Sequence, residues 1–403
     1  MKKYENRIVI VTRTTRLENV LESQNTVSQA RFYVKQLGSD FGDYEEEHRQ
    51  YSESLKLVRR DLEELGNVQM LDRKFLPNFI FAPNDMVLVV GQDGLVVNTL
   101  KYLTGQPVIG VNPDASRWDG VLLPFKPVDA GKILEETIRG KRRIENVTIA
   151  KARVQNGQEL LAVNDFFVGH KTHASARYVI KYGGLKENQS SSGIIVSTGL
   201  GSTGWMKSII AGSSRLNASI IGTPYGASQE RDDLTKVDDD DKEKAGVYFL
   251  KEHASAEEKE YKGKALWQAL APIPSGAGPA RMGMERRRSR EPEYFIEIKD
   301  KIKKEARLSG KKKTFGHSEL SSVVGKWAST ELLFAVREPF PSKTTGTNLV
   351  FGTVSPKAPL RIESLMGENG IIFSDGVEDD FIAFNSGTEV EITLADKRGK
   401  MVV

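Results

Sequence analysis

The chain of 403 residues contains no cysteine, which excludes disulfide bonds and every metal site built on thiolate ligands. Long apolar runs are also missing, and none approaches the ~20 residues needed to span a bilayer. The N-terminal MKKYENRIVIVTRTT has an apolar run only at Ile8 to Val11, too short for a signal-peptide core. The net charge of +4 is small, so neither nucleic acid nor a membrane is expected as a partner. These absences predict a soluble, cytoplasmic protein.

The order of the expected elements predicts an α/β domain in residues 1–130. Strands are expected at Arg7–Val11, Val68–Leu71, Asp85–Val90 and Pro107–Val111, and helical stretches at Leu17–Leu65 and Leu95–Leu103. The strand before Gly91 is continuously apolar, as strands of parallel sheets are when helices cover both faces. We therefore predict an open, mostly parallel sheet.

The pattern changes after about Arg143 to short strand-like runs separated by turns. These runs are Ile144–Val154, Glu159–Val168, Ala176–Tyr182, Ser191–Ser197, Ile371–Phe373 and Glu389–Leu394. They predict a mainly β domain over residues 131–403, with a C-terminal segment that returns to the first domain. A highly charged insertion at about 229–313 interrupts it, and we interpret this insertion as an arm with solvated charges.

A lone carboxylate lies between two glycines at the end of a buried strand, in Gly91-Gln92-Asp93-Gly94. Ligands of open α/β sheets bind beyond the carboxyl ends of the strands, and glycines let backbone N–H groups approach phosphate oxygens. Asp93 would suit a Mg²⁺ contact or the acceptance of a hydroxyl proton during phosphoryl transfer. Asp-Gly is also a common turn dipeptide, and the motif taken alone favours that structural interpretation.

Two further stretches carry polar groups beside apolar strands. In Thr198-Gly199-Leu200-Gly201-Ser202-Thr203-Gly204, glycines alternate with hydroxyl residues, which provides donors suited to a polyanionic or ribose-bearing ligand. In the run from Ala162 to Val168, Asn164 and Asp165 are expected inside an otherwise apolar strand, where both must find partners. An amide such as that of Asn164 can both donate and accept, which matches an adenine edge.

These pieces, in this order, resemble the NAD kinase family. The family's Gly-Gly-Asp-Gly loop is matched by Gly91-Gln92-Asp93-Gly94, its Asn-Glu or Asn-Asp pair by Asn164-Asp165, and its Thr-Pro-Thr-Gly-Ser-Thr-Ala-Tyr segment by Thr198 to Trp205. Val108 to Asn112 is similar to a Gly-Ile-Asn stretch of the family, and the segment around Asp375-Gly376 to its closing β structure. The resemblance covers most of the chain except Glu18 to Arg60 and the charged insertion.

The resemblance implies a phosphotransferase that moves a phosphoryl group from ATP, or polyphosphate, to the 2′-hydroxyl of the adenosine ribose of NAD. Asp93 would be the general base or orient that hydroxyl, while Asn164 and Asp165 would hold the adenosine. The nucleotide and phosphate contacts would be completed by Gly91, Gln92, Gly94, Thr198, Gly201, Ser202, Thr203, Trp205 and Ser208. ATP and Mg²⁺ are implied as donor and cofactor, with Mg²⁺ held by the phosphates and Asp93 as its candidate protein contact. A homo-oligomer is implied as well.

The sequence also departs from the family pattern. Gln92 stands where the family has its second glycine, Ser192 where it has an acid that reaches a ribose, and Leu200 where it has a threonine. Two alternatives therefore stay open: a kinase of a related sugar or nucleotide, and a catalytically weak nucleotide-binding sensor or interaction protein. The retained Asp93 favours an enzyme, whereas Gln92 and Ser192 favour the sensor.

Overall fold

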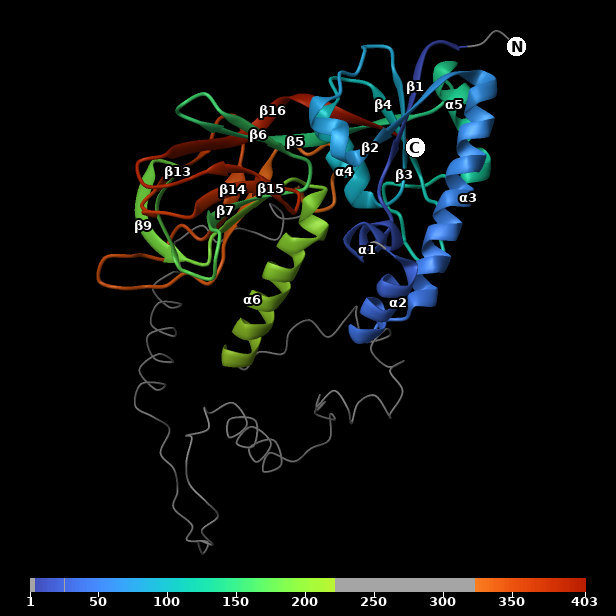
Figure 1. Ribbon diagram of the computed structural model, residues 1–403. Helices are drawn as coiled ribbons and strands as arrows, with labels where there is room; N and C mark the ends of the chain where they lie inside the picture. Colours follow the sequence, from blue (N-terminus) through green and yellow to red (C-terminus); the bar gives the residue numbers. More distant parts are fainter. Residues whose placement is uncertain (1–3, 25, 222–322) are drawn as a thin grey trace, which may run out of the picture. The chain divides into compact units, whose positions relative to one another are not determined.

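The computed structural model describes residues 4–24, 26–221 and 323–403, so the insertion predicted at about 229–313 lies outside the described residues. Residues 1–213 and 315–403 belong to one compact unit. The expected fold class is confirmed: an α/β part with a mostly parallel sheet precedes a mainly β part with an antiparallel sheet (Figure 1).

The first sheet contains ten described strands. Their path is β2 (Gly66–Asp72), β1 (Tyr4–Thr12), β3 (Met86–Val90), β4 (Pro107–Val111), β16 (Glu389–Val402), β13 (Leu360–Ser364), β8 (Ala176–Tyr182) and β9 (Leu185–Ser191), and β5 (Ile144–Val154) pairs with both β16 and β6 (Glu159–Ala162). The pairings from β2 through β4 to β16 are parallel, and the others are antiparallel. All five residues of β3 are buried, as the apolar sequence predicts.

Helices cover both faces of the parallel part. The hydrophobic cluster on one face includes residues of α3 (Phe41–Leu65) and α5 (Ala130–Ile138), and that on the other face includes α4 (Asp93–Tyr102) (Figure 1). Asp40 caps α3 by accepting a hydrogen bond from the backbone N–H of Gly42 (2.9 Å). The remaining helices of this part are α1 (Arg16–Gln24), α2 (Val27–Gln36) and the 3₁₀ turns η1 (Arg73–Asn78) and η2 (Pro127–Asp129).

Strand β16 continues the parallel part of the sheet into its antiparallel part. Its last residues pair in parallel with β4, at Lys400 with Pro107, whereas Ile392 pairs antiparallel with Leu360 of β13. Strand β16 has 14 residues because its first residues pair with β13 and its last residues pair with β4. The carboxyl end of the chain is therefore built into the sheet that begins with β1.

The second sheet is antiparallel throughout. Its order is β12 (Phe351–Val354), β11 (Leu332–Val336), β10 (Ile194–Ser197), β7 (Asp165–His170), β14 (Gly370–Ser374) and β15 (Val377–Ala383). Side chains such as Phe166 and Phe334 pack against Tyr178 and Ile362 of the first sheet in one buried cluster. The opposite face is covered by the start of α6 (Trp205–Ile221), which follows the 3₁₀ turn η3 (Gly201–Thr203).

One expected strand is wrong. The run Glu159–Val168 is two strands, β6 and β7, which are separated at Val163 and Asn164. The strand is interrupted there because the carboxylate of Asp375 accepts hydrogen bonds from the backbone N–H groups of Val163, Asn164 and Asp165. Asn164 thus lies in the connection rather than inside an apolar strand.

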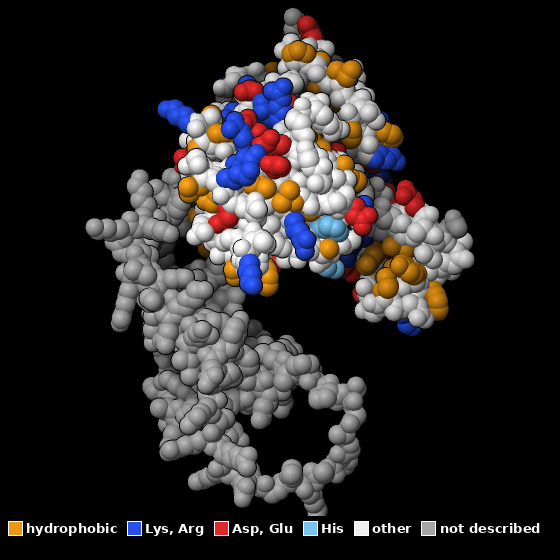
Figure 2. Space-filling model, turned by 90° about the vertical axis from the view of Figure 1, so that its left-hand side faces the viewer, with side chains coloured by type: hydrophobic (Ala, Val, Ile, Leu, Met, Phe, Trp, Pro, Cys, Tyr) orange, Lys and Arg blue, Asp and Glu red, His pale blue; other side chains and the backbone are white. Residues whose placement is uncertain are grey.

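Surface charge on the face drawn in Figure 2 is mixed in sign, with lysine and arginine side chains next to acidic ones. In the first sheet, for example, Lys181 lies within 3.1 Å of both Glu363 and Glu389. None of the helices in the described part of the chain has an apolar stretch long enough to cross a membrane.

Candidate nucleotide site

The Gly91-Gln92-Asp93-Gly94 loop connects β3 to α4 at the carboxyl edge of the parallel sheet. Gln92 is the N-cap residue of α4, although its side chain makes no capping hydrogen bond, and Asp93 is the first residue of the helix. The Asp93 carboxylate accepts hydrogen bonds from the backbone N–H groups of Leu122 (2.8 Å) and Val121 (3.3 Å). Gly91 is buried, Gly94 is exposed, and Gln92 and Asp93 are half-buried.

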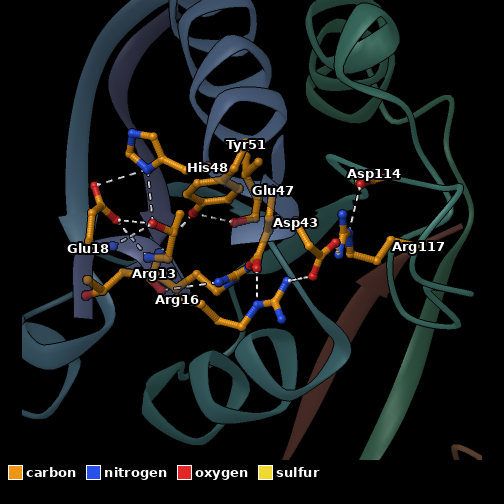
Figure 3. Close-up of polar contacts among 12 residues, drawn as sticks. Arg13, Arg16, Glu18, Asp43, Glu47, His48, Tyr51, Asp114 and Arg117 are labelled. Carbon is orange, nitrogen blue, oxygen red and sulfur yellow. Dashed lines mark hydrogen bonds and ion pairs between the residues drawn. The ribbon is translucent and has the colours of Figure 1, made fainter. Parts of the chain in front are cut away.

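A network of ion pairs borders this loop at the carboxyl end of β1 (Figure 3). Arg13 contacts Glu47 at 2.7 Å, and a Cβ placed on Gly91 would lie 3.8 Å from the Cδ of Arg13. The Nε of Arg13 is buried and has no hydrogen-bond partner among the described residues. Burial opposes ionisation of Glu47, but hydrogen bonds from Arg13 and Arg16 outweigh it and lower the pKa of that carboxyl. The Arg13 guanidinium, paired with an ionised Glu47, therefore lies beside the glycine loop.

The glycine-hydroxyl loop that begins at Thr198 is packed directly against Asn164. The backbone N–H of Thr198 donates to the Asn164 carbonyl (2.8 Å), and the Thr198 hydroxyl donates to the Val163 carbonyl (2.6 Å). A Cβ on Gly201 would lie 2.1 Å from the Asn164 carbonyl oxygen, so only glycine fits there. Two stretches that are separate in the sequence thus form one structural unit.

The hydroxyl groups of this loop serve mainly to build it. The Ser202 hydroxyl donates to the Gly199 carbonyl (2.6 Å) and accepts from the Gly325 N–H (3.0 Å), and its side chain is buried. The Thr203 hydroxyl donates to the Leu200 carbonyl (2.9 Å), but Thr203 itself is exposed. Among the hydroxyl residues of the loop, Thr203 is therefore the one best placed to meet a ligand.

Asp165 is buried at the start of β7, close to the carboxylate of Asp375. Burial, together with the charge of Asp375, raises the pKa of Asp165 to about 7. Burial also raises the pKa of Asp375, although the Lys101 ammonium and three backbone N–H groups oppose that rise. Two carboxyl groups are thus buried near each other, with the buried ammonium group of Lys101 beside Asp375.

Trp205 begins α6 and is half-buried, with its ring stacked on Phe167 at a centroid distance of 6.0 Å and an interplanar angle of 7°. The guanidinium of Arg337 lies over the same ring, 5.4 Å from its centroid. Trp205 and Ser192 line a pocket of about 280 Å³, whose other walls include His170, Lys171 and Arg337. Ser208, one turn further along α6, is exposed.

The Asp93 helix and the Thr203 loop each contribute a residue to one hydrophobic cluster. That cluster contains Leu95, two residues after Asp93, and Leu200, three residues before Thr203, together with Val163. Asp93 and Thr203 themselves are not part of that cluster, and the pocket beside Trp205 is lined by neither of them. Within the described residues, no group of three or more His, Asp or Glu side chains could hold a metal ion.

Sequence reasoning missed Arg13, Lys101 and Arg337, and it also missed the structural role of Asp375. Lys101 reads as an ordinary charge at the end of a helix, and Arg337 follows an apolar strand with no recognisable motif. The available signal was the dipeptide Asp375-Gly376, which marks a turn but not its distant partners.

The fold and the two glycine loops define a class: a two-sheet α/β protein with a glycine-flanked carboxylate at the sheet edge. No protein-family model matches the chain. It is 24% identical over 282 residues to "NAD kinase 2, mitochondrial" of Rattus norvegicus, covering 57% of this chain and 65% of the relative. It is 30% identical over 129 residues to an NAD kinase of Chlorobium phaeobacteroides, covering 31% and 44%. It is also 31% identical over 147 residues to one of Hahella chejuensis, covering 34% and 47%.

The crystal structure of an NAD kinase from Archaeoglobus fulgidus in complex with ATP superimposes with a TM-score of 0.44 at 12% identity, covering 99% of this chain and 94% of that one. The sequence relatives confirm the predicted resemblance to the NAD kinase family. The chain spans about half to two thirds of the length of these curated relatives.

Proposed function

We propose that this protein transfers the terminal phosphoryl group of ATP to the 2′-hydroxyl of the adenosine ribose of NAD. The observation that carries the proposal is that Asp93 lies at the carboxyl end of β3, while Leu95 of its helix and Leu200 of the Thr203 loop belong to one hydrophobic cluster. Ligands of open α/β sheets bind beyond the carboxyl ends of the strands. The relation to curated NAD kinases supports NAD as the acceptor.

In the proposed reaction, the ribose oxygen attacks the terminal phosphorus while the bond to the adjacent bridging oxygen breaks and ADP leaves. The hydroxyl proton passes to the carboxylate of Asp93, which its hydrogen bonds to the N–H groups of Val121 and Leu122 hold at the helix start. The exposed Gly94 leaves room for a phosphate near the N-terminus of α4. The guanidinium of Arg13 would add positive charge beside it.

Mg²⁺ would enter bound to the phosphates, where it neutralises their charge. Asp93 is the carboxylate in the loop that would contact it. Asn164 would meet the adenine edge and Asp165 the adenosine part, with Thr198, Gly201 and Ser202 shaping the loop behind them. Thr203, Trp205 and Ser208 would line the wall on the α6 side.

Incubation of the purified chain with ATP, MgCl₂ and NAD, followed by chromatographic detection of NADP, tests the proposal. Asp93→Asn should lower kcat by about 100-fold or more, since general-base catalysis contributes about 10²–10⁴. Asp119→Asn, which removes an exposed carboxylate, is the matched control and should retain full activity. Absence of NADP with both ATP and polyphosphate as donors would refute the activity, and a fully active Asp93→Asn would refute the assigned base.

A nucleotide-binding sensor is the second candidate. It is favoured by the Asp93 carboxylate already accepting two backbone hydrogen bonds and by the buried Thr198 and Ser202 hydroxyls already having protein partners. Calorimetric binding of NAD without any formation of NADP would support the sensor over the enzyme.

A further inference from the structure

The turn between β14 and β15 is a two-residue loop, in which Asp375 and Gly376 lie between the paired residues Ser374 and Val377. Asp375 adopts a φ of +55°, in the left-handed region that non-glycine residues rarely occupy, and Gly376 follows with a φ of +69°. Two-residue hairpin loops of type I′ need a positive φ at both central residues, and Asp-Gly is one of the dipeptides that they favour. Beyond its place in the turn, Asp375 contacts a distant segment through its carboxylate.

The Asp375 carboxylate is 1% exposed and gathers three consecutive backbone N–H groups. Its Oδ1 accepts hydrogen bonds from Asn164 (2.6 Å), Val163 (3.1 Å) and Asp165 (3.3 Å), and the Asp375 N–H donates to the Asp165 carbonyl (2.9 Å). Successive N–H groups that converge in this way form an anion-binding nest, here filled by a side chain of the same protein. Asp375 therefore restrains the backbone of Asn164 and Asp165.

The countercharge comes from the helix that carries Asp93. Lys101, in the last turn of α4, is 4% exposed, its Nζ lies 3.6 Å from the Asp375 carboxylate, and it donates to the Ser374 hydroxyl (2.9 Å). Lys101 lies eight residues after Asp93, about 12 Å along the helix axis. A buried charge without its partner is strongly unfavourable, so the ammonium and carboxylate groups require each other.

We propose that Asp375, with Lys101 as its countercharge, is the positioning residue that fixes Asn164 and Asp165 relative to the Asp93 helix. Asn164 in turn packs against Gly201 and accepts from Thr198, so this one ion pair connects all three sequence motifs. One part of the inference, that Asn164 and Asp165 contact NAD, rests on the proposed function. The connection itself does not depend on catalysis.

Asp375→Asn tests the positioning role, because its NH₂ would replace the Oδ2 that now faces two donors, the Val163 N–H (3.1 Å) and the Lys101 ammonium (3.6 Å). We expect the KM for NAD to rise about 10-fold or more, whereas the KM for ATP stays within about 2-fold of the wild-type value. A purely structural loss would reduce the fraction of folded enzyme and thus kcat, and it would leave the KM for NAD unchanged. Lys101→Arg, which keeps the charge, should retain a near-wild-type KM, and Asp396→Asn, at a side chain that is 98% exposed, is the control.

Amide hydrogen exchange at residues 163–165 separates this inference from the proposed function. Exchange there should be about 10-fold faster or more in Asp375→Asn than in the wild type, even in a protein that makes no NADP. If Asp375→Asn does not fold, Lys101→Met combined with Asp375→Asn removes both charges and carries the same measurement. The proposal is overturned if amide exchange at residues 163–165 is the same in Asp375→Asn as in the wild type. It is also overturned if the wild type is active and Asp375→Asn has the same KM for NAD.

Discussion

The free energy of unfolding of the wild type should fall as the pH rises from about 4 to about 7, and Asp165→Asn should abolish that fall. Burial and the neighbouring Asp375 raise the pKa of Asp165 to about 7 in the folded protein. The unfolded chain releases this proton near pH 4, so it loses protons before the folded state does. The free energy of unfolding therefore falls as the pH rises through that window. The difference between the two pKa values corresponds to about 4 kcal/mol.

Urea unfolding at intervals from pH 4 to pH 8 measures this effect, with the wild type and Asp165→Asn compared at each pH. Other carboxyl groups contribute to the slope as well: Asp375 in the same direction and Glu47, whose pKa is lowered, in the opposite one. The difference between the two curves gives the contribution of Asp165 together with its interaction with Asp375. Asp396→Asn, at an exposed position, should give a curve parallel to that of the wild type. Parallel curves for Asp165→Asn and the wild type would show that Asp165 ionises normally.

Three further substitutions test the site and its support. In Gly94→Ala, the new methyl group would point into open space on a helix, so the free energy of unfolding should rise by up to about 1 kcal/mol. The methyl group would also obstruct a phosphate at this position, so kcat/KM for ATP should fall. An unchanged kcat/KM for ATP would contradict the proposed phosphate contact. Gly201→Ala would place a methyl group 2.1 Å from the Asn164 carbonyl oxygen, so it should destabilise the protein by about 2 kcal/mol or more, and a wild-type urea midpoint would refute this packing. Tyr51→Phe removes a hydroxyl that donates to the Val90 carbonyl and accepts from the backbone N–H of Arg13. We expect the free energy of unfolding, measured in urea, to fall by about 1–3 kcal/mol. An unchanged value would mean that water replaces the hydroxyl as the partner of both groups.

Local sequence was sufficient to predict many of the elements. The strands Pro107–Val111, Ile144–Val154 and Ala176–Tyr182 have the bounds that their apolar residues and flanking turns predict. Such patterns are local because a strand's periodicity and its turn residues are adjacent in the chain. The resemblance to NAD kinases also rested on short motifs whose order can be read without a structure.

The partners of the polar groups were decided by the tertiary structure alone. Lys101 and Ser374 are 273 residues apart in the sequence, and no local pattern indicates that the helix after Asp93 ends against the Asp375 turn. The expected strand through Asn164 was wrong for the same reason, since the carboxylate that interrupts it comes from a distant turn. Residue types determined which groups need partners, because buried polar groups must be satisfied. Which groups provide them was determined by how β7, β14 and α4 pack together.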